Sequence, residues 1–182
     1  MRKLILLLLA VTGAFFTMEL SAQSIFLNVD GIEGESTVRG FEKQVEVQSY
    51  SNSAAGCQDV STSGGSRATG CKITSSGLQF SMNLSKATNG FRERLYTGKI
   101  IPKVKVSFVK RGETSLVFYT IELTNVRVTA LSESGSAGDA NPNVFIELSP
   151  ATALWSYYMQ NAAGVPTLTN QFGWDFQKAG PL

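Results

Sequence analysis

The stretches 103-KVKVSF-108 and 117-VFYTIEL-123 decide the fold, because apolar side chains recur at every second position in both. Successive side chains of a strand point to opposite faces, so this period of two predicts two strands with one apolar face each. Between them, Arg111-Gly112-Glu113 has the composition of a hairpin turn. The two stretches therefore predict an antiparallel hairpin.

The alternation resumes at Val126 and Val128, but its parity has shifted by one, which predicts a bulge near Asn125. Similar runs occur on both sides of this region, at 25–29, 42–50, 78–84, 144–148, 153–160 and 172–177. Many short alternating strands with Gly, Ser and Asn turns are typical of a sandwich or barrel. We therefore expect a mainly β fold.

One segment, Lys86–Thr97, has helical spacing. Ser85 is a suitable N-cap residue, Phe91 and Leu95 lie four positions apart, and Gly98 can end the segment in the left-handed conformation. We expect a short helix with a single apolar stripe.

The N-terminus has the features of a secretory signal peptide. Arg2 and Lys3 precede an apolar run from Leu4 to Phe16, and small residues up to Ala22 provide a cleavage site. A membrane anchor is less favoured because the run is shorter than the roughly 20 residues of a spanning helix. A buried helix is less favoured because the run has no polar face. We expect residues 1–22 to be removed, leaving one exported domain, 23–182, that is periplasmic or secreted.

The charge of the mature chain is close to zero. Without residues 1–22 it contains 14 basic and 13 acidic residues, a formal charge of +1. This balance argues against a nucleic-acid partner or a membrane surface bound through bulk charge. After Phe16 the sequence contains no apolar run long enough to span a bilayer.

The two cysteines, Cys57 and Cys71, are both in the mature chain. An even number of cysteines in an exported protein indicates a disulfide, and two unpaired thiols are the alternative. Because the chain has no histidine, Ser-His-Asp and Cys-His catalytic systems are excluded, and a metal or other cofactor site is not indicated. Ser107 and Lys110 form a Ser-x-x-Lys pattern, but it lies on a predicted strand, so we expect no enzyme activity.

Three other features bear on interactions. The segment Ser51–Ser76 is rich in Ser, Gly and Thr, which predicts a long exposed loop. Lys103 and Lys105 share one face of a strand, either as solvated residues or as a lining for cargo or a neighbouring subunit. Aromatic residues gather near the C-terminus, where strands with large side chains on both faces can bury one face against a partner. These late aromatic residues are Trp155, Tyr157, Tyr158, Phe172, Trp174 and Phe176.

The order of these motifs resembles that of the Hcp (haemolysin-coregulated protein) family, which builds the inner tube of type VI secretion systems. The resemblance rests on Gly31-Ile32-Glu33-Gly34-Glu35-Ser36 after the first strand, Leu78–Ser81, Ser85–Thr88, Thr97-Gly98-Lys99 and the run from Phe118 to Thr129. It covers most of residues 24–177.

The resemblance implies a compact β-barrel of two packed sheets with one short helix, and a subunit that closes into a hexameric ring, with rings able to stack. It also implies secretion-machine or effector proteins as partners. In this family the loop after the second strand contacts neighbours, which points by position to Ser51, Ser53, Gly64 and Gly65 as contact residues.

One feature departs from the family. Hcp proteins typically lack a cleaved leader, so the predicted signal peptide raises the question of whether a contractile machine delivers this chain. The alternative function is a monomeric secreted binding module that uses the same barrel for a glycan or a protein.

Overall fold

The computed structural model describes residues 23–56, 74–110, 115–161 and 164–182. Within these ranges the chain forms ten strands and one helix. In chain order they are β1 (Gln23–Val29), β2 (Val45–Val47), β3 (Ser49–Ala55), β4 (Thr74–Asn83), α2 (Lys86–Thr97), β5 (Ile101–Lys110), β6 (Leu116–Ser134), β7 (Asn143–Ser149), β8 (Thr152–Gln160), β9 (Pro166–Asp175) and β10 (Gly180–Pro181).

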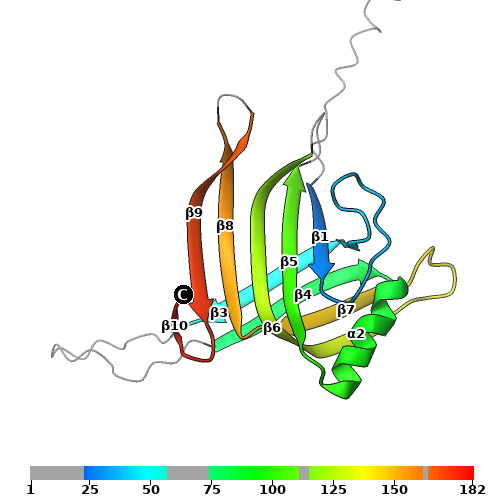
Figure 1. Cartoon of the computed structure of the whole chain (residues 1–182). Helices are drawn as coiled ribbons and strands as arrows, with labels where there is room; N and C mark the ends of the chain where they lie inside the picture. The colour runs from blue at the N-terminus through cyan, green and yellow to red at the C-terminus, as the bar shows by residue number, and fades with distance from the viewer. Residues whose placement is uncertain (1–22, 57–73, 111–114, 162–163) are drawn as a thin grey trace, which may run out of the picture.

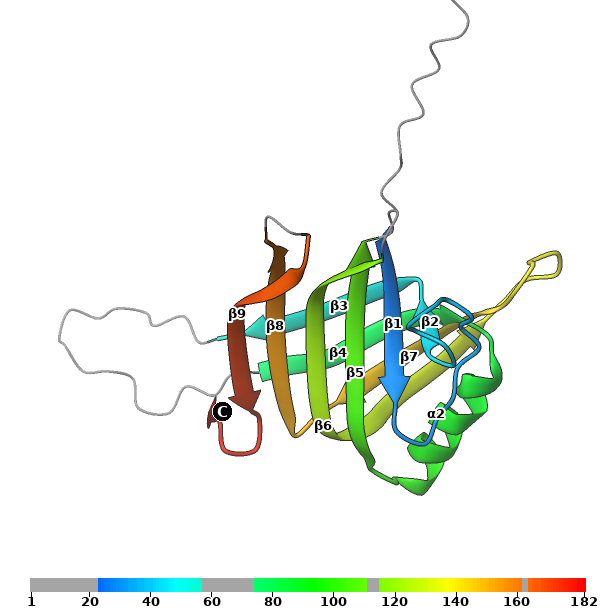
Figure 2. The ribbon, with the colours of Figure 1, turned by 45° about the horizontal axis from the view of Figure 1, so that its top comes forward.

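The strands form two sheets that share β6 and close into a barrel (Figures 1 and 2). The first sheet has the order β10-β9-β8-β6-β5-β1-β2, and the second has the order β3-β4-β7-β6. At the opposite corner the chain passes from β2 in the first sheet to β3 in the second through Gln48, whose amide donates to the Ser81 carbonyl at 2.8 Å. The predicted barrel of two packed sheets with one short helix is confirmed.

The bend in β6 coincides with the parity shift in the sequence. Before the bend, Thr124 pairs with Thr152 of β8, and after it Arg127 pairs with Ser149 of β7. Asn125 lies between them with a φ of 49°, a left-handed conformation that asparagine tolerates better than most residues. The predicted irregularity near Asn125 is confirmed, and it is the point where β6 leaves one sheet for the other.

The core lies between the two sheets, and the alternating residues of the sequence supply it. Val104 and Val106 of β5, and Ile121 and Leu123 of β6, are fully buried on the inner face of the first sheet. They face buried residues of the second sheet, which are Leu78, Phe80, Met82, Val144, Ile146 and Leu148. Burial of these apolar side chains is the main favourable contribution to folding.

The helix has the predicted bounds. Ser85 is the N-cap residue, and its backbone amide donates to the Thr88 hydroxyl at 3.2 Å. Gly98 ends α2 with a φ of 66°. Gly90 lowers helix propensity but allows close packing, since an added Cβ would lie 2.9 Å from the Ile32 side chain.

Two predicted boundaries are wrong. The loop predicted over Ser51–Ser76 is shorter, because Ser51–Ala55 continue β3 and Thr74–Ser76 begin β4. β3 is an edge strand with mainly exposed side chains, so its sequence lacks the apolar alternation that identifies a strand. The last long strand begins at Pro166 and ends at Asp175, whereas 172–177 was predicted, because the exposed first part of β9 gives no core signal.

Several predictions fall outside the described residues. These are the signal peptide at 1–22, the pair Cys57 and Cys71, the contact residues Gly64 and Gly65, and the turn at 111–113.

Candidate assembly surface

The described residues contain no group of three or more side chains suited to binding a metal ion. They also include no helix long and apolar enough to cross a membrane. The pKa values of three glutamate carboxyl groups are lowered by specific partners: lysines contact Glu33 and Glu122, and the backbone amides of Glu42 itself and of Gly40 donate to Glu42.

The positive charge of the two lysines on β5 is partly neutralised by Glu122 of β6. Lys103 and Lys105 share the outer face, as predicted, and both contact Glu122, at Nζ to Oε distances of 2.9 and 3.2 Å. Hydrogen bonding from Lys103, with a smaller contribution from Lys105, lowers the pKa of Glu122. The two lysines therefore do not form a free cationic patch.

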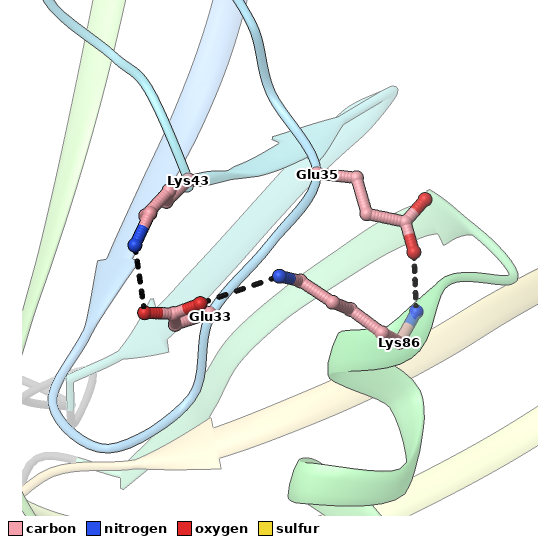
Figure 3. Close-up of polar contacts among 4 residues, drawn as sticks. All are labelled: Glu33, Glu35, Lys43 and Lys86. Atoms are coloured by element: carbon pink, nitrogen blue, oxygen red, sulfur yellow. Dashed lines mark hydrogen bonds and ion pairs between the residues drawn. The ribbon is translucent and has the colours of Figure 1, made fainter.

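The segment after β1 holds the start of α2 (Figure 3). The Glu33 carboxylate lies between Lys43 and Lys86, with Oε to Nζ distances of 3.4 and 3.3 Å. The Glu35 carboxylate accepts a hydrogen bond from the Lys86 backbone amide at 2.9 Å. Anionic groups are favourable at a helix N-terminus, where backbone N–H groups lack partners. Both glutamates are exposed, and each binds a specific partner.

Strands β8 and β9 extend the first sheet beyond the barrel, and we call this extension the wing (Figures 1 and 2). Its inner face carries a ladder of aromatic rings, in which Phe172 lies 5.8 Å from Trp155 and 6.2 Å from Trp174 between ring centroids. Phe172 is 54% exposed. Other large apolar residues of the wing are also exposed, namely Tyr157, Met159 and Leu168.

Among the described strands, none pairs with the outer edge of β9 over most of its length. β10 pairs only with Trp174 and Asp175, and the Leu182 amide donates to the Gly173 carbonyl. From Pro166 to Phe172, no other described strand pairs with this edge. These residues are exposed and include no charged side chain. Edge strands are normally protected by charges or by cover, so this edge has the character of a surface that another chain covers.

A small apolar pocket opens where the wing overhangs β3 and β4. It has a volume of about 160 Å³. Four aromatic side chains form one wall, and Asn52, Ala54 and Ser75 form the other. The aromatic residues are Trp155, Phe172, Trp174 and Phe176. We call this cavity the aromatic pocket.

The opposite flank of the molecule also presents apolar side chains. Tyr96, in the last turn of α2, is 79% exposed, and Ile100 and Leu84 near the two ends of the helix are exposed as well. Both ribbon views place α2 and β9 on opposite sides of the barrel (Figures 1 and 2). The molecule therefore exposes large apolar side chains on two different flanks.

Of the predicted contact residues, the structure describes Ser51 and Ser53. Ser51 and Ser53 are exposed on β3, and the Ser53 hydroxyl lies 2.9 Å from the Ser76 hydroxyl of β4. Their role in assembly stays a prediction. Sequence reasoning noted the late aromatic residues but missed Leu168 and Tyr96, because a single apolar residue carries no sign of its own exposure.

The family model described as "Type VI secretion system effector, Hcp" matches residues 26–157. Among curated proteins, none matches this chain by sequence.

Solved structures share the fold over almost their whole length. Hcp1 from Salmonella typhimurium is 25% identical, with a TM-score of 0.69 over 88% of this chain and 99% of that one. Hcp2 from the same organism is 26% identical, with a TM-score of 0.59 over 85% and 96%. A structure described only as a type six secretion system protein reaches a TM-score of 0.77 at 21% identity, over 88% and 100%.

Proposed function

This chain belongs to the Hcp family of type VI secretion proteins, whose members are tube subunits, and on that premise we propose that six mature copies close into a ring through the wing. Membership of this family supports a homo-oligomer in general and does not favour a monomeric binding module.

The observation that carries this proposal is the combination of an uncharged edge on β9, which no described strand covers from Pro166 to Phe172, with exposed apolar side chains on the opposite flank. A ring built from identical subunits needs a heterologous contact, in which one surface of each copy meets a different surface of the next. The wing supplies the first surface through β9. The helix flank around Tyr96 supplies the second. Burial of exposed apolar area in this contact would stabilise the ring.

Export is the second part of the proposal. The predicted signal peptide at 1–22 supports transfer of the chain across the inner membrane, with the mature subunit beginning at Gln23. The ring then assembles after export, in the periplasm or outside the cell. Stacking of rings and contact with secretion-machine or effector proteins follow the family's function, and both stay predictions for this chain.

A single charge on the wing tests ring closure. Leu168 is 48% exposed on β9, so Leu168→Lys should leave the fold intact while placing an unpaired charge in the contact. We expect residues 23–182 to elute at six times the monomer mass in size-exclusion chromatography with light scattering, and the variant to elute as a monomer.

Arg127→Glu is the matched control, because Arg127 is exposed on β6 away from the wing. This control should retain the ring. A monomeric wild-type chain at about tens of micromolar would contradict the proposal, since assembly is driven by concentration. A Leu168→Lys ring of normal mass would remove the wing from the contact.

A further inference from the structure

The aromatic pocket is a small cavity lined mainly by aromatic side chains. Its walls carry no charged side chain, and its volume of about 160 Å³ is small. The exposed Phe172 forms part of the wall, with rings on both sides at 5.8 and 6.2 Å. An additional ring placed against this ladder would make offset-stacked or edge-to-face contacts, which contribute beyond the burial of area.

Tyr96 is the most exposed large apolar residue of the described chain. It lies in the last turn of α2, where the side chain projects from a helix that Phe91 anchors in the core. Tyrosine is among the residue types enriched at positions that carry most of the binding energy of an interface.

We infer that Tyr96 of one copy inserts into the aromatic pocket of the next copy around the ring. The inference rests on the proposed ring and names the central contact within it. α2, which carries Tyr96, and β9, which lines the pocket, lie on different sides of the barrel (Figures 1 and 2). A heterologous contact joins two such different surfaces of neighbouring copies. The ring of Tyr96 meets aromatic walls, and its hydroxyl can bond at the polar rim formed by Asn52 and Ser75.

Two variants separate the two halves of this contact. Tyr96→Ala removes the inserted side chain and leaves the pocket open. Ala54→Phe fills the pocket from β3 and leaves Tyr96 in place. Both positions are exposed, so each chain should fold, and circular dichroism with thermal melting verifies this. Each variant alone should weaken the contact by about 30-fold, the loss expected for an anchor residue, and fail to form rings.

Mixing the two variants provides the decisive measurement. The Ala54→Phe chain can insert its Tyr96 into the open pocket of the Tyr96→Ala chain, but neither chain can extend this pair. Native mass spectrometry of an equimolar mixture should therefore show a heterodimer with no ring. Glu93→Ala on the exposed face of α2 is the matched control and should keep the ring. Tyr96→Phe should keep it as well.

Different outcomes overturn different claims. If both variants form normal rings, the Tyr96 contact is wrong and the ring proposal stands. If Tyr96→Ala abolishes the ring but the mixture yields no heterodimer, the aromatic pocket is not the partner of Tyr96. If Ala54→Phe instead lowers the melting temperature and keeps the ring, the pocket is filled by the same chain, which also overturns the inference. A monomeric wild type removes the proposed function itself.

Discussion

Gly34 has no room for a side chain. A Cβ at this position would lie 2.1 Å from the Gln44 carbonyl oxygen and 2.4 Å from the Val45 backbone nitrogen. The Gly34 amide donates to the Lys43 carbonyl at 2.7 Å, so the two backbones are in direct contact. The neighbouring Glu33 and Glu35 side chains point away to hold α2 (Figure 3). Gly34 thus fixes the distance between the segment after β1 and the start of β2.

Replacement of this glycine should therefore be costly. We expect Gly34→Ala to lower the free energy of unfolding by about 3 kcal/mol, because the obstacle is backbone that cannot rotate away. Urea denaturation of the purified domain measures the change. Gly56→Ala is the control, since nothing lies within 4 Å of a Cβ there, and it should stay within about 0.5 kcal/mol of wild type. Equal stability of the two variants would contradict the tight contact.

For the individual elements, the apolar pattern of the sequence predicted which face of a strand or of the helix is buried. The bounds of α2 follow from Ser85 and Gly98, whose effects on the backbone are local. The bend of β6 follows from the shift in apolar parity at Asn125. The first part of β9 was missed because Pro166–Phe172 are exposed in the subunit. A period of two is informative only where one face of a strand enters the core.

The ion pairs between β5 and β6 predict a dependence on pH. Lys103 and Lys105 hold Glu122, and the pKa of its carboxyl is lowered from 4.5. A lowered pKa in the folded state contributes stability that is fully present above pH 4.5 and is lost as the pH falls through the folded-state value.

We expect Glu122→Gln to reduce the melting temperature at neutral pH by a small amount, equivalent to less than about 1 kcal/mol because the pair is partly exposed. The difference from wild type should shrink as the pH falls from 4.5 through the lowered folded-state pKa, below which the glutamate is neutral in both states. Added salt should shrink it too. A difference that stays constant from pH 7 to pH 3 would show that the carboxylate charge is not the cause.

At the scale of the whole molecule, closure of the barrel brings distant parts of the chain together. The aromatic pocket combines Asn52 and Ala54 of β3 with Trp155 of β8 and Phe172 of β9. No local pattern links residues that lie about a hundred positions apart, so the pocket appears only once the wing overhangs β3. The same closure places α2 and β9 on opposite flanks.

The predicted bridge between Cys57 and Cys71 concerns the stability of the exported chain. It would close a loop of about 15 residues and contribute about 3 kcal/mol on the chain-entropy model. We expect no titratable thiol in unfolded, unreduced protein that was exported under oxidising conditions. After reduction, two thiols should appear and the melting temperature should fall. Two thiols detected before reduction would exclude the bridge.

The β class of this protein, its helix, the bend of β6 at Asn125 and the order of motifs that marks its family all follow from the amino-acid sequence. These features depend on residues within a few positions of one another, because side-chain period, capping and turn chemistry act locally. Which apolar residues remain outside the core follows from the packing of the folded chain. Leu168 and Tyr96 resemble core residues in the sequence, but both are exposed. β9 turns Leu168 away from the barrel, and α2 does the same with Tyr96. Exposure depends on how distant elements pack, so the candidate assembly surface could be found only in the folded subunit.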